Sequence, residues 1–184
     1  MTELRALLVQ SRNYDEPDLM DEFIALAETA GYSVIGTFDV VGPRLARFGL
    51  SRGKVEEIRT WVEINSPDVV LFSPLLKSSQ MYRLMEEWDV EVRDRTQVIL
   101  EIFDRHARTL QAKLQIEEAR LRYELPFIRH QLRMRLQREH TGARPVGEQT
   151  GAGEDILNLR IMQVRRRISI IRAKLRQIMQ VQQL

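Results

Sequence analysis

The chain has 184 residues, of which 43% are hydrophobic and none is cysteine, so it can bury one sizeable core but can form neither a disulfide nor a thiolate metal site. No apolar run reaches about 18 residues and no signal peptide precedes the first acidic residues, so we expect a cytoplasmic protein without a membrane span. The net charge of +2 is divided unevenly, with 11 Lys and Arg against 19 Asp and Glu in residues 1–104 and 17 against 7 in residues 105–184. This division predicts an acidic globular part and a basic part that meets a polyanion, although charged faces of a solvated helical pair would give the same count.

The first part alternates short apolar runs rich in β-forming residues with amphipathic stretches. The predicted strands are Leu4–Gln10, Tyr32–Val41, Val69–Phe72 and Val90–Arg93. The predicted helices are Asp18–Ala30, Lys54–Ile64, Ser78–Trp88 and Thr96–Phe103. Strands that alternate with helices predict an α/β domain over residues 1–104, in which a small parallel sheet is flanked by helices.

The second part, residues 105–184, reads as two long helices. Apolar residues recur at spacings of 3, 4 and 7 in both segments, and the second follows an unbroken heptad pattern. We therefore expect an antiparallel helical hairpin of the coiled-coil type, with a first helix about 50 Å long at ~1.5 Å per residue. Pro126 removes one backbone donor from that helix and should kink it. The predicted contact residues are Leu110, Leu114, Leu121, Leu125, Ile128 and Leu132 in the first helix, and Leu157, Ile161, Val164, Ile168, Ile171, Leu175 and Ile178 in the second.

A glycine-rich stretch, HTGARPVGEQTGAGED, separates the two helices. It holds four of the nine glycines of the chain, and the predicted tip loop of residues 140–153 is longer than the 2–8 residues that usually join packed helices. Glycine gives a loop conformational freedom that a tight turn lacks. The stretch is therefore either a probing loop or a mere connector.

No catalytic centre and no metal site can be assigned. Gly53–Lys54 fails as a phosphate-binding loop, because Phe48 occupies the position of the first glycine and Val55 that of the hydroxyl residue. We expect a turn over Gly49–Gly53 that starts a helix at Lys54, where the helix N-terminus leaves Gly53 and Lys54 as candidates for weak nucleotide binding. The three histidines lack metal-ligand spacing, and no nucleophile stands beside a base.

Basic residues on both sides of the tip loop form the stronger candidate site. Arginine forms bidentate contacts with phosphate, and the absence of interleaved aromatic residues argues against a stacking platform for single strands. Solubility of a long helical pair is the alternative explanation. The candidate RNA-binding residues are Arg129, Arg133, Arg135, Arg138, His140, Arg144, Gly147, Gly151, Gly153 and Arg160.

Five stretches together resemble the N-terminal part of the HflX family of translational GTPases. The most specific is DRTQVILEIF, which is similar to the DRT-x-LIL-x-IF signature of that family. The five stretches are AETAGYSVIG (27–36), GKVEEI (53–58), DRTQVILEIF (94–103), ARTLQAKLQIEEARLRYELPFIR (107–129) and GAGED (151–155).

The resemblance implies a protein that binds the large ribosomal subunit and its rRNA, with the loop between the two helices reaching toward the peptidyl-transferase region. It also implies a GTPase domain in cis that binds GTP and Mg²⁺. The present residues contain no complete P-loop and no Asn-Lys-x-Asp element for guanine, so we expect no cofactor in this chain and no GTP hydrolysis by it. Two alternatives remain open, an α/β domain that binds ATP or another nucleotide at the carboxyl ends of its strands, and a coiled-coil dimerisation module.

Overall fold

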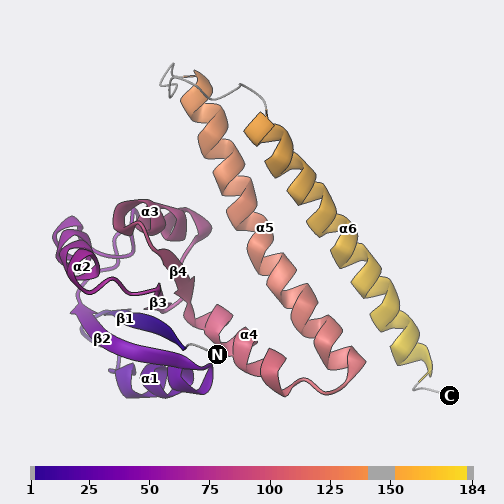
Figure 1. Cartoon of the computed structure of the whole chain (residues 1–184), viewed down its shortest axis with the longest axis horizontal. Coiled ribbons are helices and arrows are strands. Elements are labelled where there is room, and N and C mark those ends of the chain that lie inside the picture. Colours follow the sequence, from indigo (N-terminus) through magenta and orange to yellow (C-terminus); the bar gives the residue numbers. More distant parts are fainter. Residues whose placement is uncertain (1–2, 141–151, 182–184) are drawn as a thin grey trace. The chain divides into compact units, whose positions relative to one another are not determined.

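The computed structural model describes residues 3–140 and 152–181, and the chain divides into two compact units, Met1–Arg105 and His106–Leu184. The side chains of residues 138–140 and 152–154 lie outside the description. Figure 1 shows the elements of both units. In the described residues, no helix is long and apolar enough to cross a membrane.

The first unit is built on a four-stranded parallel sheet in the order β2-β1-β3-β4. Both central strands contain four consecutive residues that are almost completely buried, as expected where helices cover both faces of a parallel sheet. The predicted α/β class, its parallel sheet and its eight elements are confirmed, with bounds that differ by a few residues. The elements are β1 (Leu4–Arg12), α1 (Met20–Thr29), β2 (Tyr32–Val41), α2 (Arg52–Asn65), β3 (Val69–Ser73), α3 (Ser78–Trp88), β4 (Glu91–Asp94) and α4 (Arg95–His106).

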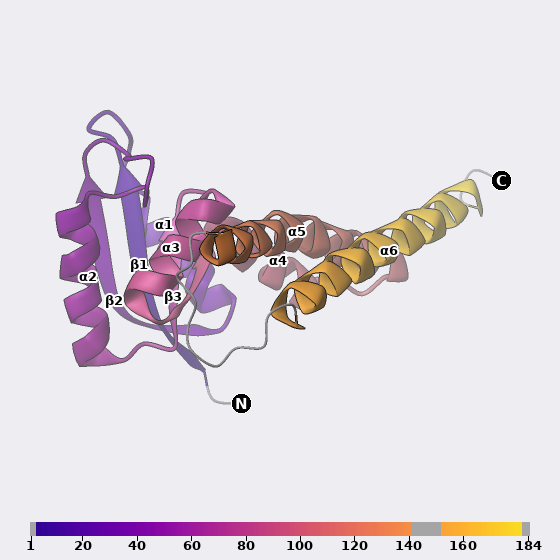
Figure 2. The ribbon, with the colours of Figure 1, turned by 90° about the horizontal axis from the view of Figure 1, so that it is seen from above.

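Helices cover the sheet on both faces (Figure 1), and α1 and α4 share one of them, where Phe23 and Val98 pack with Leu8 and Leu71 of the central strands. On the other face, Trp61 of α2 lies edge-on to Phe38 of β2, with ring centroids 6.2 Å apart. Figure 2 shows the same layers from above. Helices α2 and α3 are joined by a hydrogen bond in which Trp88 Nε1 donates to the carbonyl oxygen of Val55 at 3.0 Å. Because successive side chains of a strand point to opposite faces of the sheet, each central strand contributes apolar residues to both layers of the core.

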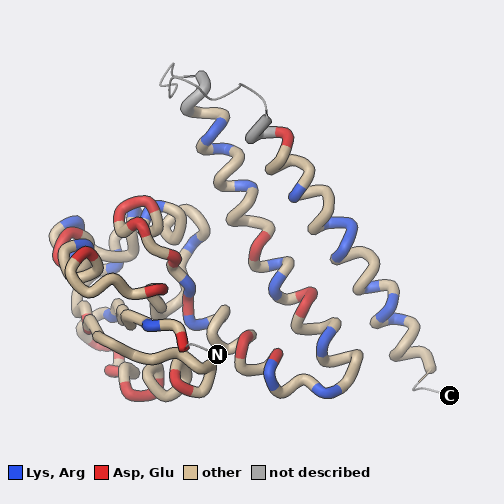
Figure 3. The backbone as a smooth tube through the Cα atoms, in the orientation of Figure 1, with Lys and Arg blue, Asp and Glu red and all other residues tan. Residues whose placement is uncertain are grey.

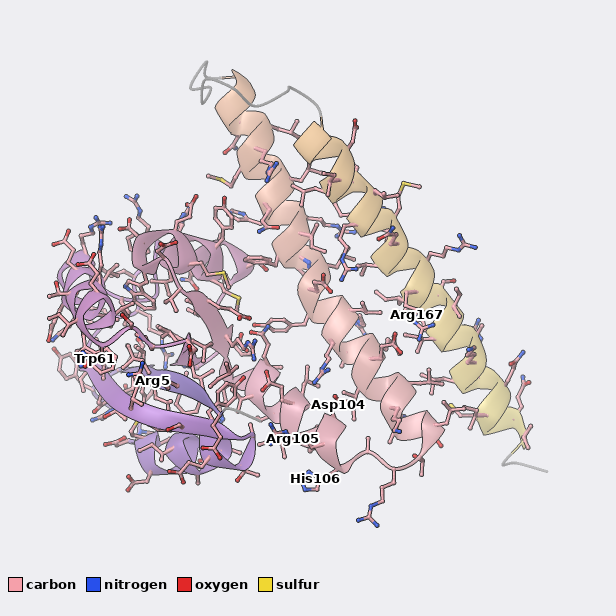
Figure 4. The ribbon with its side chains drawn as sticks, viewed as in Figure 1. Arg5, Trp61, Asp104, Arg105, His106 and Arg167 are labelled. Carbon is pink, nitrogen blue, oxygen red and sulfur yellow. The ribbon has the colours of Figure 1, made fainter. Side chains whose placement is uncertain are left out.

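Two polar residues stabilise helix ends, Arg5 at the end of α2 and Asp94 at the start of α4. Arg5, labelled in Figure 4, donates through its guanidinium to the carbonyl oxygens of Asn65 and Ser66 at the end of α2. Asp94 is fully buried and caps α4, because its Oδ1 accepts from the amide of Thr96 at 3.0 Å while its own amide donates to Gln97 Oε1 at 3.1 Å. This reciprocal arrangement is a capping box, and the DRTQ stretch encodes it.

The second unit is the helical arm, which consists of α5 (Leu110–His140) and α6 (Ala152–Val181). The two helices contact each other along much of their length and run antiparallel, since Glu124 pairs with Arg160 and Glu117 pairs with Arg167. The predicted helical hairpin is therefore confirmed. Helix α5 continues on both sides of Pro126, and the predicted kink there stays a prediction.

Three details differ from the expectations. Leu110 is 64% exposed and does not take part in helix packing, because it is the first residue of α5. Helix α2 begins at Arg52 rather than Lys54, since Ser51 caps it by accepting from the amide of Lys54 at 3.4 Å. Gly53 therefore lies inside a helix and not in a turn.

Gly36 and Gly53 should respond in opposite ways to substitution by alanine. A Cβ on Gly36 would lie 2.4 Å from a ring carbon of Trp61, so Gly36→Ala should lower the free energy of unfolding by about 1–3 kcal/mol, as overpacking does. A Cβ on Gly53 meets nothing within 4 Å, so Gly53→Ala should raise it by about 0.5–1 kcal/mol. Urea unfolding followed by circular dichroism measures both, and a gain from Gly36→Ala would show that Trp61 does not cover β2 as described.

Asp94 should make the stability of the first unit depend on pH between about 4 and 6. Burial raises the pKa of Asp94 to about 6, although amide hydrogen bonds from Gln97, Leu76 and Thr96 oppose the shift. The folded state then holds the proton more tightly than an unfolded chain with a pKa of about 3.9, so this contribution to stability is present below about pH 4 and is lost as the pH rises toward 6. The unfolding free energy of Asp94→Asn relative to the unsubstituted protein should therefore rise from pH 4 to pH 6.5 and stay constant above it. A difference that does not change with pH over this range would contradict the buried, raised carboxyl.

Candidate nucleic-acid interface

The arm is held together by an apolar seam between α5 and α6. In its core, Ile128 of α5 packs with Ile161, Val164 and Ile168 of α6, and none of these four side chains is more than 8% exposed. The heptad spacing predicted for α6 matches its buried positions, because Ile171 is also fully buried. The seam is completed by the partly buried Leu121, Leu125, Leu132 and Leu157.

Three arginines of α6 form ion pairs across the seam. Arg167 makes a bidentate contact with Glu117, with Nε–Oε1 at 2.6 Å and Nη2–Oε2 at 2.8 Å. The hydrogen bond from Arg167 holds the pKa of Glu117 below its ordinary value. Figure 4 labels Arg167 on the side of α6 that faces α5. The other two pairs join Arg160 to Glu124 at 2.7 Å and Arg172 to Glu118 at 2.8 Å.

Other arginines of the arm are exposed and have no ion-pair partner among the residues that the structure describes. In α6, Asp155 is the last acidic residue, and every charged residue after it in that helix, from Arg160 to Arg176, is basic (Figure 3). Their guanidinium groups are free to contact an external anion, which makes this surface chemically suited to phosphate. These arginines are Arg122, Arg129, Arg133 and Arg135 in α5, and Arg165, Arg166 and Arg176 in α6.

The sequence-predicted RNA-binding residues fall into three groups. Arg129, Arg133 and Arg135 are exposed on α5, whereas Arg160 is engaged by Glu124. For Arg138, His140 and Gly153 only the backbone is described, at the end of α5 and in the first turn of α6. Three residues of the predicted loop, His140, Ala152 and Gly153, therefore belong to helices. Arg144, Gly147 and Gly151 lie outside the described residues.

Two exposed arginines that lie farther from the loop, Arg122 and Arg176, were not among the residues predicted to bind RNA. The helical repeat could have identified them, because Arg122 stands seven residues before Arg129 and Arg176 stands eleven after Arg165.

The first unit offers little to a nucleotide at the positions named from the sequence. Lys54 pairs its amine with Glu57 at 2.7 Å, and its amide is occupied by the Ser51 cap. The stretch Asp39–Gly42 has the Asp-x-x-Gly spacing that GTPases use near magnesium, but it lies on β2 and Asp39 accepts from Arg12 and Gln10. The hydrogen bond from Arg12 lowers the pKa of Asp39, and its exposed carboxylate is paired with that arginine. Lys54 and Asp39 are therefore both engaged by other side chains of the first unit.

No group of three or more His, Asp or Glu side chains within residues 3–140 and 152–181 could hold a metal ion. The polar groups at the carboxyl ends of the strands bond to one another, since the buried Gln10 donates to both Asp18 and Asp39 at 2.9 Å. The polar groups at this edge thus satisfy one another, whereas the arm carries exposed arginines without an ion pair among the described residues.

Comparison with known proteins gives matches along nearly the whole chain. The family model described as "GTP-binding GTPase N-terminal" matches residues 17–104, and the model described as "GTP-binding GTPase Middle Region" matches residues 106–184. A GTPase HflX from Thermofilum pendens is 36% identical over 95% of this chain and 40% of its own length. A GTPase HflX from Caldanaerobacter subterraneus is 34% identical over 95% of this chain and 40% of its own length.

Solved structures show the same fold. A GTP-binding protein from the hyperthermophilic archaeon Sulfolobus solfataricus, crystallised with GDP, aligns with a TM-score of 0.63 and 27% identity. The alignment covers 95% of this chain and 45% of that one. The chain thus spans about 40% of the length of the curated relatives it matches along most of its own length.

The seam should be the main source of stability in the arm. Ile168→Ala removes a side chain that is 8% exposed and should lower the free energy of unfolding by about 2–5 kcal/mol. Met162→Ala, at a position that is 66% exposed on the same helix, should change it by less than about 0.5 kcal/mol. Loss of helical circular dichroism with temperature measures both variants, and equal effects would show that α6 does not bury the predicted face.

Proposed function

Because the chain belongs to the HflX family of GTP-binding proteins, we propose that it forms the part of such a protein that contacts the ribosome. In this proposal the arm binds rRNA of the large subunit through its exposed arginines and its glycine-rich loop. GTP and Mg²⁺ are assigned to a GTPase domain in cis, because the present sequence contains no complete P-loop and Lys54 is paired with Glu57.

The observation that carries the proposal is the separation of charge between the two units. The first unit carries the acidic excess, and the arm carries 17 Lys and Arg against 7 Asp and Glu over residues 105–184. A cationic arm attracts a phosphate backbone, whereas an acidic body is repelled by it. Binding to RNA would then be restricted to the arm and would not spread over the whole surface.

The state of the arginines supports the same proposal. Intramolecular ion pairs occupy Arg160, Arg167 and Arg172 and stabilise the hairpin, while seven other arginines of the described part of the arm remain exposed without such pairs. Phosphate contacts of this kind fix position and orientation without reading sequence. We therefore assign the arm a positioning role on folded rRNA.

Cosedimentation of the chain with separated ribosomal subunits, over a salt series, tests the proposal. We expect binding to large subunits that weakens steeply with salt, because each phosphate contact adds about 0.7–0.9 to the slope of log K against log salt. Replacing Arg129 and Arg133 by Ala should weaken binding by roughly tenfold or more and reduce that slope by about 1–2.

A matched control removes the same charge from the first unit. Lys54→Ala combined with Arg59→Ala takes two cations from α2, where both are paired with glutamates. This control should bind large subunits like the unsubstituted protein. Failure of the unsubstituted protein to cosediment with large subunits at moderate salt would refute the proposal, and an equal loss in both variants would mean that net charge alone drives binding.

A further inference from the structure

The seam of the arm has two flanks that differ in how their arginines are used. On one side, which we call the paired flank, basic residues of α6 repeat every seven positions at Arg160, Arg167 and Lys174. They face glutamates of α5 that also stand seven apart, Glu117 and Glu124. Because residues seven apart lie on one face of a helix, these ion pairs all lie along a single edge of the hairpin.

The opposite side, which we call the arginine flank, is composed of six arginines. Three belong to α5 and follow Glu118 at spacings of 4, 7 and 4, so they share a face with it. Three belong to α6 and follow one another at spacings of 7 and 4. The contact between Arg172 and Glu118 joins the two rows along the same edge of the hairpin. The six residues of the arginine flank are Arg122, Arg129 and Arg133 in α5, and Arg165, Arg172 and Arg176 in α6.

Five of these six arginines have no ion-pair partner among the described residues, and all six are exposed. Arg172 alone is neutralised, by Glu118. On the paired flank, Arg160 and Arg167 are held by glutamates, and Arg135 is the unpaired arginine beyond them. The hairpin therefore presents its row of uncompensated guanidinium groups mainly on one edge.

We propose that the arginine flank is the surface of the arm that binds RNA, and that it binds the phosphate backbone of a folded, double-helical segment. This assignment rests on the proposed function and narrows it. Of the seven exposed arginines of the described arm that have no ion pair, it keeps Arg122, Arg129, Arg133, Arg165 and Arg176 and leaves out Arg135 and Arg166. The arginine flank extends over about 28 Å at ~1.5 Å per residue. Helix α5 provides the part from Arg133 to Glu118, and α6 continues it from Arg172, which contacts Glu118, to Arg176.

The chemistry of the row favours a phosphate backbone over exposed bases. A line of cations of this length suits a regularly spaced line of phosphates, which double-helical RNA presents on either side of its shallow minor groove. Base recognition in single strands uses aromatic side chains for stacking, and residues 107–181 contain only two of them, Tyr123 and Phe127. The flank thus has the composition of a surface that reads the shape and charge of RNA.

A comparison of two triple variants of the complete chain tests the assignment. The flank variant carries Arg122→Gln, Arg129→Gln and Arg165→Gln. The control variant carries Lys113→Gln, Arg135→Gln and Arg166→Gln, all exposed, outside both rows and without an ion pair in the described structure. Both lose three positive charges, so they differ only in where the charge is removed. Circular dichroism and thermal unfolding establish that both fold, and glutamine preserves helix propensity.

The probes are large ribosomal subunits and a duplex RNA of arbitrary sequence, each over a salt series. We expect the flank variant to bind both on the order of tenfold or more weakly, with a slope of log K against log salt lower by about 2–3. The control variant should bind as the unsubstituted protein does. Lysine at the same three flank positions should restore the slope, because it restores the charge.

Each other outcome overturns a separate statement. An equal loss in both variants, or no loss in the flank variant while the unsubstituted protein still binds large subunits, would overturn the flank assignment and leave the proposed function standing. Failure of the unsubstituted protein to bind large subunits would overturn the proposed function itself. Equally tight binding to poly-glutamate or to phosphatidylserine vesicles would show a surface for anions in general and would overturn the assignment to RNA.

Discussion

The packing of α5 against α6 along the apolar seam determines which arginines of α6 are held by glutamates of α5 and which arginines of the arm remain exposed without an ion pair among the described residues. Ile128 is held among Ile161, Val164 and Ile168, and this contact fixes the rotation of each helix about its own axis. Once the rotation is fixed, Glu117 faces Arg167 and Glu124 faces Arg160, and most of the remaining arginines of both helices lie away from these glutamates. The charge pattern of the arm is therefore a consequence of hydrophobic burial, since exposed ion pairs contribute only about 0–1 kcal/mol each and could not set the register alone.

The polar residues of the two units have different roles in the structure. In the first unit the informative polar residues serve the fold: Arg5 closes the end of α2, Asp94 caps α4 and Gln10 joins Asp18 to Asp39. In the arm, helix pairing satisfies few of the arginines and leaves the others at the surface. The proposed function rests on this difference between an acidic first unit and a cationic arm.

Several features were predictable because they depend on local patterns. The strands and helices of the first unit follow from runs of β-forming residues and from helical periodicity, and α3 has the predicted bounds, Ser78–Trp88. The heptad of α6 identified Ile161, Val164, Ile168 and Ile171 as buried. The start of α2 was misplaced because Ser51 competes with the glycine that follows it, and an N-cap hydroxyl prevails over a glycine as a signal for a helix start. Leu110 was wrongly included in the seam, because periodicity alone does not tell where a helix begins.

By itself, the sequence determined the α/β class, the helical hairpin, the acidic and basic parts and the family, because composition, periodicity and short motifs are properties of the chain. Only the tertiary structure decided that Arg160 is engaged by Glu124 while Arg129 and Arg133 are not, and that Asp94 is buried at the start of α4. The physical reason is that an ion pair between residues 36 positions apart, such as Arg160 and Glu124, depends on the register of two helices. That register follows from side-chain packing across the seam, which no local pattern in the sequence specifies.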